Sequence, residues 1–224
     1  MGATHSRKTT LPAVFAFAVA AAALGAGPAA ARDEPPAVGG GSGIVIDQRA
    51  TCTLTTVGYD AAGRLVGLTA GHCGEPGASV SAEAAPDQGV VGRFVRTNHE
   101  LDYAVIAFDP DRISPVNRVG TLSIADIGAP AQFPNVVCKK GRTTGSTCGV
   151  TWGDLAGPES RTWTQLCVLE GDSGAPIVVG RTLVGMVNAY YGVGCFGPEM
   201  GTDIHAVVAD LNAGSEVGAG FRPI

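Results

Sequence analysis

Residues 168–180 read VLEGDSGAPIVVG, in which the tight, charged turn Gly171-Asp172-Ser173-Gly174 precedes an apolar run. A serine in such a turn either ends a strand or acts as a nucleophile whose hydroxyl is held out by the bend. A nucleophilic serine requires a base within hydrogen-bond reach and a carboxylate that orients this base. The tetrapeptide does not distinguish the two roles, so the rest of the chain must decide.

The chain around this turn has the pattern of an all-β protein. From Ile44 onward, short runs rich in Val, Ile and Thr are separated by Gly, Pro, Asp or Asn, and many strands at such spacing predict a sandwich or barrel. The runs lie at 43–47, 52–59, 64–70, 90–95, 102–108, 135–138, 161–169, 176–180 and 182–192. Residues 203–214 predict one helix, because their apolar positions recur every three to four residues before a glycine.

The first 31 residues predict a secretory signal peptide. Arg7 and Lys8 precede an uncharged, mostly apolar run at 11–24, and residues 25–31 are small and end in Ala-Ala-Ala. A membrane anchor is the alternative, but this run of 14 residues is shorter than the roughly 20 that a spanning helix needs. We therefore expect cleavage after Ala31 and a secreted protein.

Composition limits the partners of the exported part. Residues 32–43, RDEPPAVGGGSG, predict a flexible leader, and the strand pattern that follows indicates one domain over 44–224. Removal of residues 1–31 leaves 13 basic and 20 acidic side chains, a net charge of −7. So acidic a chain has no electrostatic attraction to nucleic acid or anionic lipid, and we expect neither as a partner. We expect a monomer.

Six cysteines lie in the exported part. An even number in an oxidising compartment predicts three disulfides, although the sequence leaves fifteen pairings open. A zinc site is the competing interpretation, but no two cysteines are two to four residues apart and no histidine pair has ligand spacing, so we expect no metal or other cofactor. The cysteines are Cys52, Cys73, Cys138, Cys148, Cys167 and Cys195.

Three histidines remain as candidate bases after cleavage. His72 stands at a predicted strand end in LTAGHCG, where the adjacent Cys73 can hold it, although an ordinary turn histidine is the alternative. His99, in the polar turn RTNHE, and His205, at the start of the predicted helix, have no such constraint. We interpret both as surface or partly packed residues.

Asp102 is the candidate orienting acid. It begins DYAVIAF, an apolar strand that can carry its side chain into the interior. A buried carboxylate is costly without a partner, and a histidine would remove much of that cost. The alternative is an aspartate that caps the strand.

Four segments in order resemble a known family. LTAGHC (68–73), LDYAVIAF (101–108) and GDSGAP (171–176) resemble the signature blocks of the chymotrypsin-like serine peptidases. VVCKKGRTTGSTCG (136–149) is similar to a segment of their bacterial branch, which includes α-lytic protease and the streptogrisins. The likeness, which runs from about residue 44 to residue 211, implies two six-stranded antiparallel β-barrels with the active site in the cleft between them, and a C-terminal helix.

The resemblance also implies the catalytic residues. It assigns Ser173 as nucleophile, His72 as general base and Asp102 as the acid that orients the base. The backbone N–H groups of Gly171 and Ser173 would form the oxyanion hole, whose donors stabilise charge that develops in the transition state.

Two structural features follow from the same resemblance. Lys139, directly after a cysteine, takes the place of the basic residue that pairs with the buried Asp172 in the bacterial branch. The resemblance also selects one disulfide pairing out of the fifteen. The pairs are Cys52 with Cys73, Cys138 with Cys148, and Cys167 with Cys195.

The sequence departs from the family around the substrate. Ala175 replaces a glycine in the serine block, and the pocket segment has tyrosines where relatives have glycines, which would narrow or close the pocket. Cys167 aligns with the pocket base, where no aspartate stands, so cleavage after Lys or Arg is not expected. The pocket residues implied by the resemblance are Cys167, Val168, Asn188, Ala189, Tyr190 and Tyr191.

These patterns lead to one main functional hypothesis and two alternatives. The main hypothesis is a secreted serine endopeptidase that hydrolyses peptide or protein substrates through an acyl-enzyme on Ser173. The first alternative is a catalytically weak or inactive binding or regulatory protein of the same fold with an occluded pocket, which Ala175 and the tyrosines favour. The second is a disulfide-stapled β-protein without a catalytic ancestor, which the ordered motifs disfavour.

Overall fold

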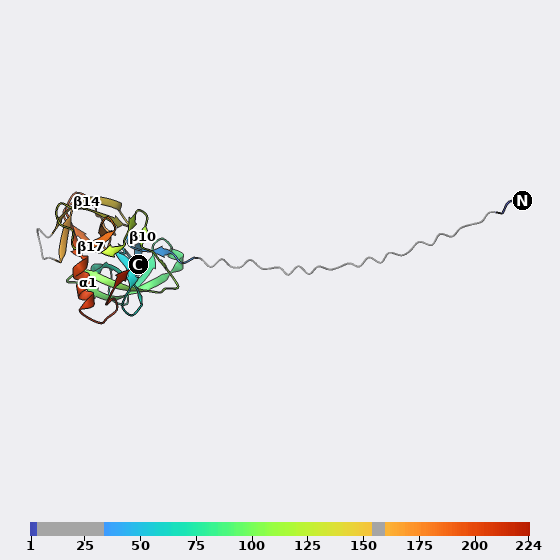
Figure 1. Ribbon diagram of the computed structural model, residues 1–224, viewed down its shortest axis with the longest axis horizontal. Helices are drawn as coiled ribbons and strands as arrows, with labels where there is room; N and C mark the ends of the chain where they lie inside the picture. Colours follow the sequence, from blue (N-terminus) through green and yellow to red (C-terminus); the bar gives the residue numbers. More distant parts are fainter. Residues whose placement is uncertain (4–33, 154–159) are drawn as a thin grey trace. The chain divides into compact units, whose positions relative to one another are not determined.

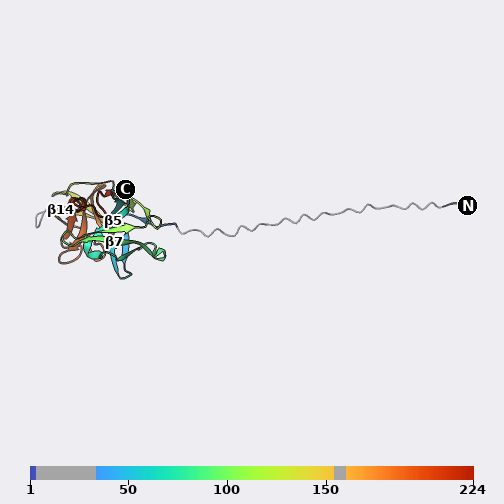
Figure 2. The same cartoon turned by 90° about the horizontal axis from the view of Figure 1, so that it is seen from below.

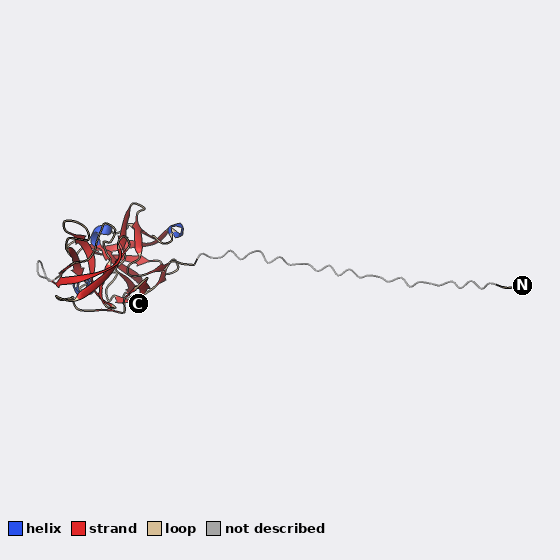
Figure 3. Ribbon diagram, turned by 90° about the horizontal axis from the view of Figure 1, so that it is seen from above, coloured by secondary structure: helices blue, strands red, loops and turns tan. Residues whose placement is uncertain are grey.

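Two mainly antiparallel β-sheets account for most of the chain that the structure, a computed structural model, describes: residues 1–3, 34–153 and 160–224 (Figure 3). The predicted signal peptide, apart from residues 1–3, lies outside the described residues. The all-β fold predicted from the strand pattern is confirmed, and the described residues contain one α-helix, near the C-terminus as expected.

The first sheet contains eight strands in the order β19-β4-β5-β8-β7-β6-β2-β3 and curls into a half-barrel. Its inward-facing apolar side chains, among them Ile44, Leu54 and Phe94, form a fully buried core. Its strands are β2 (Gly43–Ile46), β3 (Ala50–Thr53), β4 (Thr56–Tyr59), β5 (Leu65–Ala70), β6 (Ser79–Ala82), β7 (Val90–Asn98), β8 (Tyr103–Phe108) and β19 (Arg222–Pro223).

The second sheet has the order β12-β17-β16-β13-β14-β15-β18, and pairing of β17 with β18 closes six of its strands into a barrel. Figure 2 shows β14 of this sheet and β5 and β7 of the first. Its strands are β12 (Asp126–Ile127), β13 (Val136–Gly141), β14 (Gly145–Gly153), β15 (Arg161–Thr164), β16 (Pro176–Val179), β17 (Thr182–Tyr190) and β18 (Glu199–Asp203). The two sheets form the two-barrel architecture that the resemblance implies.

A second cluster of buried side chains lies between the sheets. Helix α1 (Ile204–Asn212) begins after Asp203, whose side chain accepts the N–H of His205 and caps the helix (Figure 1). Its buried Val207 and Leu211 share this cluster with Val105 of β8 and Met186 of β17. The helix therefore packs against both barrels and stabilises their contact.

Two predicted strands differ from the structure. The run 52–59 is divided into β3 and β4, because the chain exchanges hydrogen-bond partners at its centre: the N–H of Leu54 donates to Ser42 and that of Thr55 to Leu68. Of the run 161–169, only residues 161–164 form a strand, and the rest leads into the serine turn. The strands β6 and β18 were not predicted from the sequence. Their Ser, Gly, Glu and Asp residues interrupt the apolar runs by which strands were recognised.

The predicted flexible leader is largely packed. β1 (Ala37–Val38) pairs in parallel with β9 (Ser114–Pro115), and Val38 belongs to the first core. A Cβ on Gly39 would lie 2.2 Å from the carbonyl oxygen of Val116, so the glycine permits a close approach here rather than flexibility. The folded chain therefore begins near Ala37, not at Ile44. Shortly after β9, the two-residue strands β10 (Arg118–Val119) and β11 (Leu122–Ser123) pair with each other in antiparallel.

We predict that Val38→Ala lowers the free energy of unfolding by about 1–3 kcal/mol, because the side chain is 2 % exposed and its removal leaves a cavity. Urea denaturation of the protein that begins at Arg32 measures this. Val193→Ala is the matched control, since Val193 is 68 % exposed. Equal stability of the two variants would show that residues 37–43 do not contribute to the fold.

Candidate active site

The three residues predicted to be catalytic are joined by a chain of hydrogen bonds. His72 is in the 3₁₀ turn η1 (Gly71–Cys73), Asp102 precedes β8, and Ser173 precedes β16. Nδ1 of His72 lies 2.9 Å from Oδ2 of Asp102, and Nε2 lies 2.8 Å from Oγ of Ser173. His72 and Asp102 come from the first barrel, and Ser173 comes from the second.

Asp102 is held in an unusual backbone conformation. Its φ is +54°, a left-handed conformation that aspartate tolerates better than most residues. Its Oδ1 accepts the backbone N–H of His72 at 2.8 Å, and the Asn188 amide donates to Oδ2 at 2.8 Å. Burial alone would raise the pKa of Asp102, but His72 and Asn188 hold this pKa below its ordinary value. The carboxylate therefore stays ionised beside the imidazole.

The disulfides have the pairing that the resemblance implies. Cys52 joins Cys73, next to His72, so that the bond ties the turn carrying the imidazole to β3. The other bonds join Cys138 to Cys148, across the β13–β14 hairpin, and Cys167 to Cys195. The described residues include no cluster of three or more His, Cys, Asp or Glu side chains suited to a metal ion.

The backbone of the serine turn requires glycine at position 171. Gly171 has φ +93°, and a Cβ there would lie 2.5 Å from Oγ1 of Thr143. Among the hydrogen bonds of the described residues, none uses the N–H of Gly171 or of Ser173 as a donor. Both N–H groups are therefore free to bind an oxyanion.

Ala175 does not distort this turn. Its φ is not positive, its methyl group is buried in the second barrel core, and its N–H donates to the carbonyl of Asp172. The turn therefore accommodates alanine where the family has glycine.

Asp172 and Lys139 form an ion pair that is completely buried, with Nζ 3.2 Å from Oδ2. The backbone N–H groups of Thr143 and Thr144 donate to Oδ1 at 2.9 and 3.1 Å, and that of Leu169 to Oδ2 at 3.1 Å. Burial alone would raise the pKa of Asp172, but the Thr144 hydroxyl, Leu169 and Lys139 keep this pKa below its ordinary value. The buried carboxylate is therefore ionised, and both of its oxygens accept hydrogen bonds.

A pocket of about 270 Å³ opens beside Ser173. Tyr190 lines this pocket, whereas Tyr191 packs against Trp163, with ring centroids 5.3 Å apart, and is not among its lining residues. Tyr191 follows the last residue of β17, so of the two tyrosines only Tyr190 narrows the pocket. The described lining residues are Val168, Leu169, Glu170, Ser173, Asn188, Ala189 and Tyr190; of the predicted set, Cys167 and Tyr191 are absent.

Sequence reasoning missed several polar residues that hold the serine turn. Thr53 of β3 donates from its N–H to the carbonyl of Ser173 and from its hydroxyl to that of Gly171, and the Thr55 hydroxyl donates to Gly174. Isolated threonines in a strand carry no signal of this role, because the contact joins residues about 120 positions apart.

The other two histidines lie outside the line of three. Nε2 of His99 is 3.0 Å from Glu75, with both side chains exposed, and His205 is exposed at the start of α1. This placement agrees with their interpretation as surface residues.

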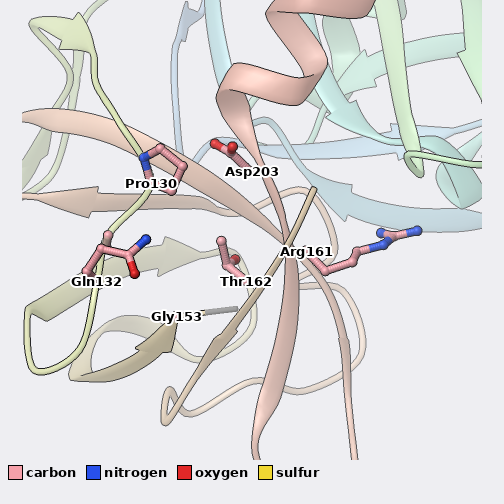
Figure 4. A pocket seen from close by; sticks show the side chains of 7 residues that line it. Pro130, Gln132, Gly153, Arg161, Thr162 and Asp203 are labelled. Carbon is pink, nitrogen blue, oxygen red and sulfur yellow. The ribbon is translucent and has the colours of Figure 1, made fainter. Parts of the chain in front are cut away.

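A second pocket, of about 220 Å³, is lined from β15, β18 and residues 130–132 (Figure 4). Arg161 points away from the other labelled side chains and donates to Glu100 and Leu101. Asp203 caps α1. Both charged side chains thus have structural partners, and we assign this pocket no role.

We predict that Lys139→Met lowers the free energy of unfolding by about 3–5 kcal/mol, because Asp172 is left buried without its counter-ion. Lys139→Met combined with Asp172→Asn should recover much of this loss. Guanidinium denaturation of both variants at neutral pH is the measurement. A single variant as stable as the parent would contradict a buried charged pair.

Comparisons with known proteins agree with this geometry. The chain is 31 % identical over 201 residues to "Uncharacterized protein Rv1815" of Mycobacterium tuberculosis, a match that covers 81 % of this chain and 87 % of the relative. No family model matches the chain.

Solved structures of bacterial proteases share the fold. Nocardiopsis protease superposes with a TM-score of 0.66 at 24 % identity, over 78 % of this chain and 96 % of that protein. An α-lytic protease homolog, N4, superposes with a TM-score of 0.64 at 25 % identity, over 79 % and 97 %. The chain therefore belongs to the family of the mycobacterial relative and shares the fold of the bacterial chymotrypsin-like serine proteases.

Proposed function

We propose that the protein is a secreted serine endopeptidase that cleaves peptide or protein substrates through an acyl-enzyme. The observation that carries the proposal is the line of hydrogen bonds from Asp102 through His72 to Ser173, at 2.9 and 2.8 Å. Two free N–H groups beside the serine complete the set of groups that acyl transfer needs.

Acylation begins with attack by Oγ of Ser173 on the substrate carbonyl carbon, while Nε2 of His72 accepts the hydroxyl proton. The negative charge that forms on the carbonyl oxygen is stabilised by the N–H groups of Gly171 and Ser173. The intermediate collapses when His72 donates its proton to the leaving amine. A water molecule, activated by the same imidazole, then hydrolyses the ester and restores the serine.

Asp102 supports both half-reactions without changing its own protonation. Its carboxylate accepts a hydrogen bond from the N–H at Nδ1 of His72, which leaves Nε2 free to act as base. The carboxylate also stabilises the imidazolium that forms. Asn188 donates from its amide to the carbonyl oxygen of Asp102 at 2.7 Å as well as to Oδ2. We assign Asn188 as a positioning residue for the acid, in addition to its place in the pocket wall.

Export remains a proposal that rests on the predicted signal peptide and the three disulfides, which suit an oxidising compartment. Among the described residues, the structure has no helix with the length and apolar character that crossing a bilayer needs. We propose that the protein acts outside the cell as a monomer on peptide substrates.

We predict that a fluorophosphonate probe labels Ser173 of the oxidised protein and fails to label Ser173→Ala. Labelling needs a hydroxyl activated by a base, and Nε2 of His72 lies 2.8 Å from Oγ of Ser173. Mass spectrometry of the labelled peptide is the measurement. Folded parent protein that resists the probe would overturn the proposed function and favour the alternative, a binding protein of this fold.

We also predict that Asn188→Ala lowers kcat/KM by about 10–100-fold, the contribution of a hydrogen bond to a charged group. Peptide hydrolysis gives kcat/KM, and thermal unfolding tests whether the variant is folded. An unchanged kcat/KM in a folded variant would show that His72 alone is enough to orient Asp102.

A further inference from the structure

The turn that carries the Gly171 N–H is fixed at both of its ends. The N–H of Asp172 donates to the carbonyl of Leu169 at 3.0 Å, and the N–H of Leu169 donates to Oδ2 of Asp172 at 3.1 Å. Residues 169–172 therefore form a β-turn in which Glu170 and Gly171 are the two central residues. Gly171 has φ +93°, whereas the φ of Glu170 is not positive, and this combination identifies a type II turn.

The central peptide of this turn, between Glu170 and Gly171, has two possible orientations. A type I turn has the same ends, but its central peptide is rotated by roughly 180°. In the observed type II form, the Gly171 N–H is one of the two donors proposed for the oxyanion. In the type I form the Glu170 carbonyl would take its place, and an acceptor there would repel the charge that develops on the substrate oxygen. The orientation of one peptide therefore decides whether the oxyanion hole has both of its donors.

The Glu170 carbonyl accepts one hydrogen bond among the described residues, from the hydroxyl of Thr143 at 2.7 Å. The C=O and N–H groups of a trans peptide point in opposite directions. A donor that holds the Glu170 carbonyl on one side of the peptide therefore keeps the Gly171 N–H on the other side. Rotation of the peptide to the type I form would break this bond.

An ion pair orients the Thr143 hydroxyl. Nη1 of Arg142 donates to Oγ1 of Thr143 at 3.2 Å, which leaves the single hydroxyl proton for the Glu170 carbonyl. Nε and Nη2 of Arg142 donate to the two carboxylate oxygens of Glu83, Nε at 2.8 Å. The hydrogen bond from Arg142 holds the pKa of Glu83 below its ordinary value, so this carboxylate stays ionised at neutral pH. Glu83 follows β6, so the chain of contacts begins in the first barrel and ends at the turn before Ser173.

We propose that the Thr143 hydroxyl keeps the Glu170–Gly171 peptide in the orientation that directs its N–H into the cleft. Arg142, held by Glu83, orients this hydroxyl, and Thr143 is thus a positioning residue. The inference rests on the proposed function, because it names what completes the oxyanion hole of that site. The Thr143 side chain is exposed, and its backbone N–H binds Oδ1 of Asp172 without using the hydroxyl. Loss of the hydroxyl should therefore release this peptide and leave the rest of the turn in place.

The test compares the rate constants with which a fluorophosphonate probe labels Ser173 in the parent and in three variants. Thr143→Val removes the hydroxyl at nearly constant volume, and we expect its rate constant to fall about 2–10-fold, the contribution of a neutral hydrogen bond. Thr143→Ser keeps a hydroxyl and should recover most of the parent rate. Thr121→Val, the matched control, also loses an exposed hydroxyl, one that lies 3.1 Å from Oγ of Ser146, and should react like the parent.

Steady-state kinetics distinguish positioning from a general loss of structure. The oxyanion forms only on the way to the transition state, so Thr143→Val should lower kcat and leave KM unchanged for a peptide p-nitroanilide that the parent cleaves. Arg142→Met should lower kcat as well, and in combination with Thr143→Val it should add no further loss, because both residues act on the same peptide. Losses that multiply in the double variant would show that Arg142 acts elsewhere and overturn its part in the inference.

Crystal structures separate this inference from the proposed function. A rate constant reduced about 2–10-fold means that half or fewer of the molecules keep the N–H in the cleft, so the electron density of Thr143→Val should show the Glu170 carbonyl turned into the cleft in the others. A fully type II turn in Thr143→Val, or labelling at the parent rate, would overturn the inference. A parent that resists the probe would overturn the peptidase, while the structures would still decide the role of Thr143. If Thr143→Val does not fold, Thr143→Ala removes the same hydroxyl and takes its place in both measurements.

Discussion

The buried carboxylate of Asp172 is the constraint on which the rest of the site depends. A charge with no access to water must be surrounded by donors, and Asp172 obtains them from Lys139 and from the backbone of Thr143, Thr144 and Leu169. These bonds tie the β13–β14 turn to the segment before Ser173. The N–H groups on either side of Asp172, those of Gly171 and Ser173, donate no hydrogen bond among the described residues.

The site also depends on how the two barrels pack together. His72 and Asp102 come from the first barrel and Ser173 from the second, so a small shift between them would break the 2.8 Å contact of His72 with the serine. Three features oppose such a shift: the apolar cluster under α1, the threonines of β3 and the following segment, and the pair of Arg142 with Glu83. The geometry is thus maintained by contacts that carry no catalytic role.

Much of the fold could be predicted because its strands have local signals. Val-rich runs bounded by glycine marked most strands, and the period of residues 203–214 marked the helix. The packed leader was missed because glycine and proline indicate flexibility unless another segment lies close enough to require them, as Val116 does at Gly39. The division of 52–59 was missed for a related reason, since the exchange of partners at Leu54 depends on distant segments.

For the site, the sequence by itself determined which residues are present: the serine turn, His72 beside a cysteine, and Asp102 at the head of an apolar strand. These residues are visible as sequence motifs because each of them depends on particular neighbours within a few positions along the chain. Only the tertiary structure decided that Asn188 holds Asp102, and that Thr53 and Thr55 hold the serine turn. These contacts join the first barrel to the second, so they depend on how the whole molecule packs rather than on nearby sequence.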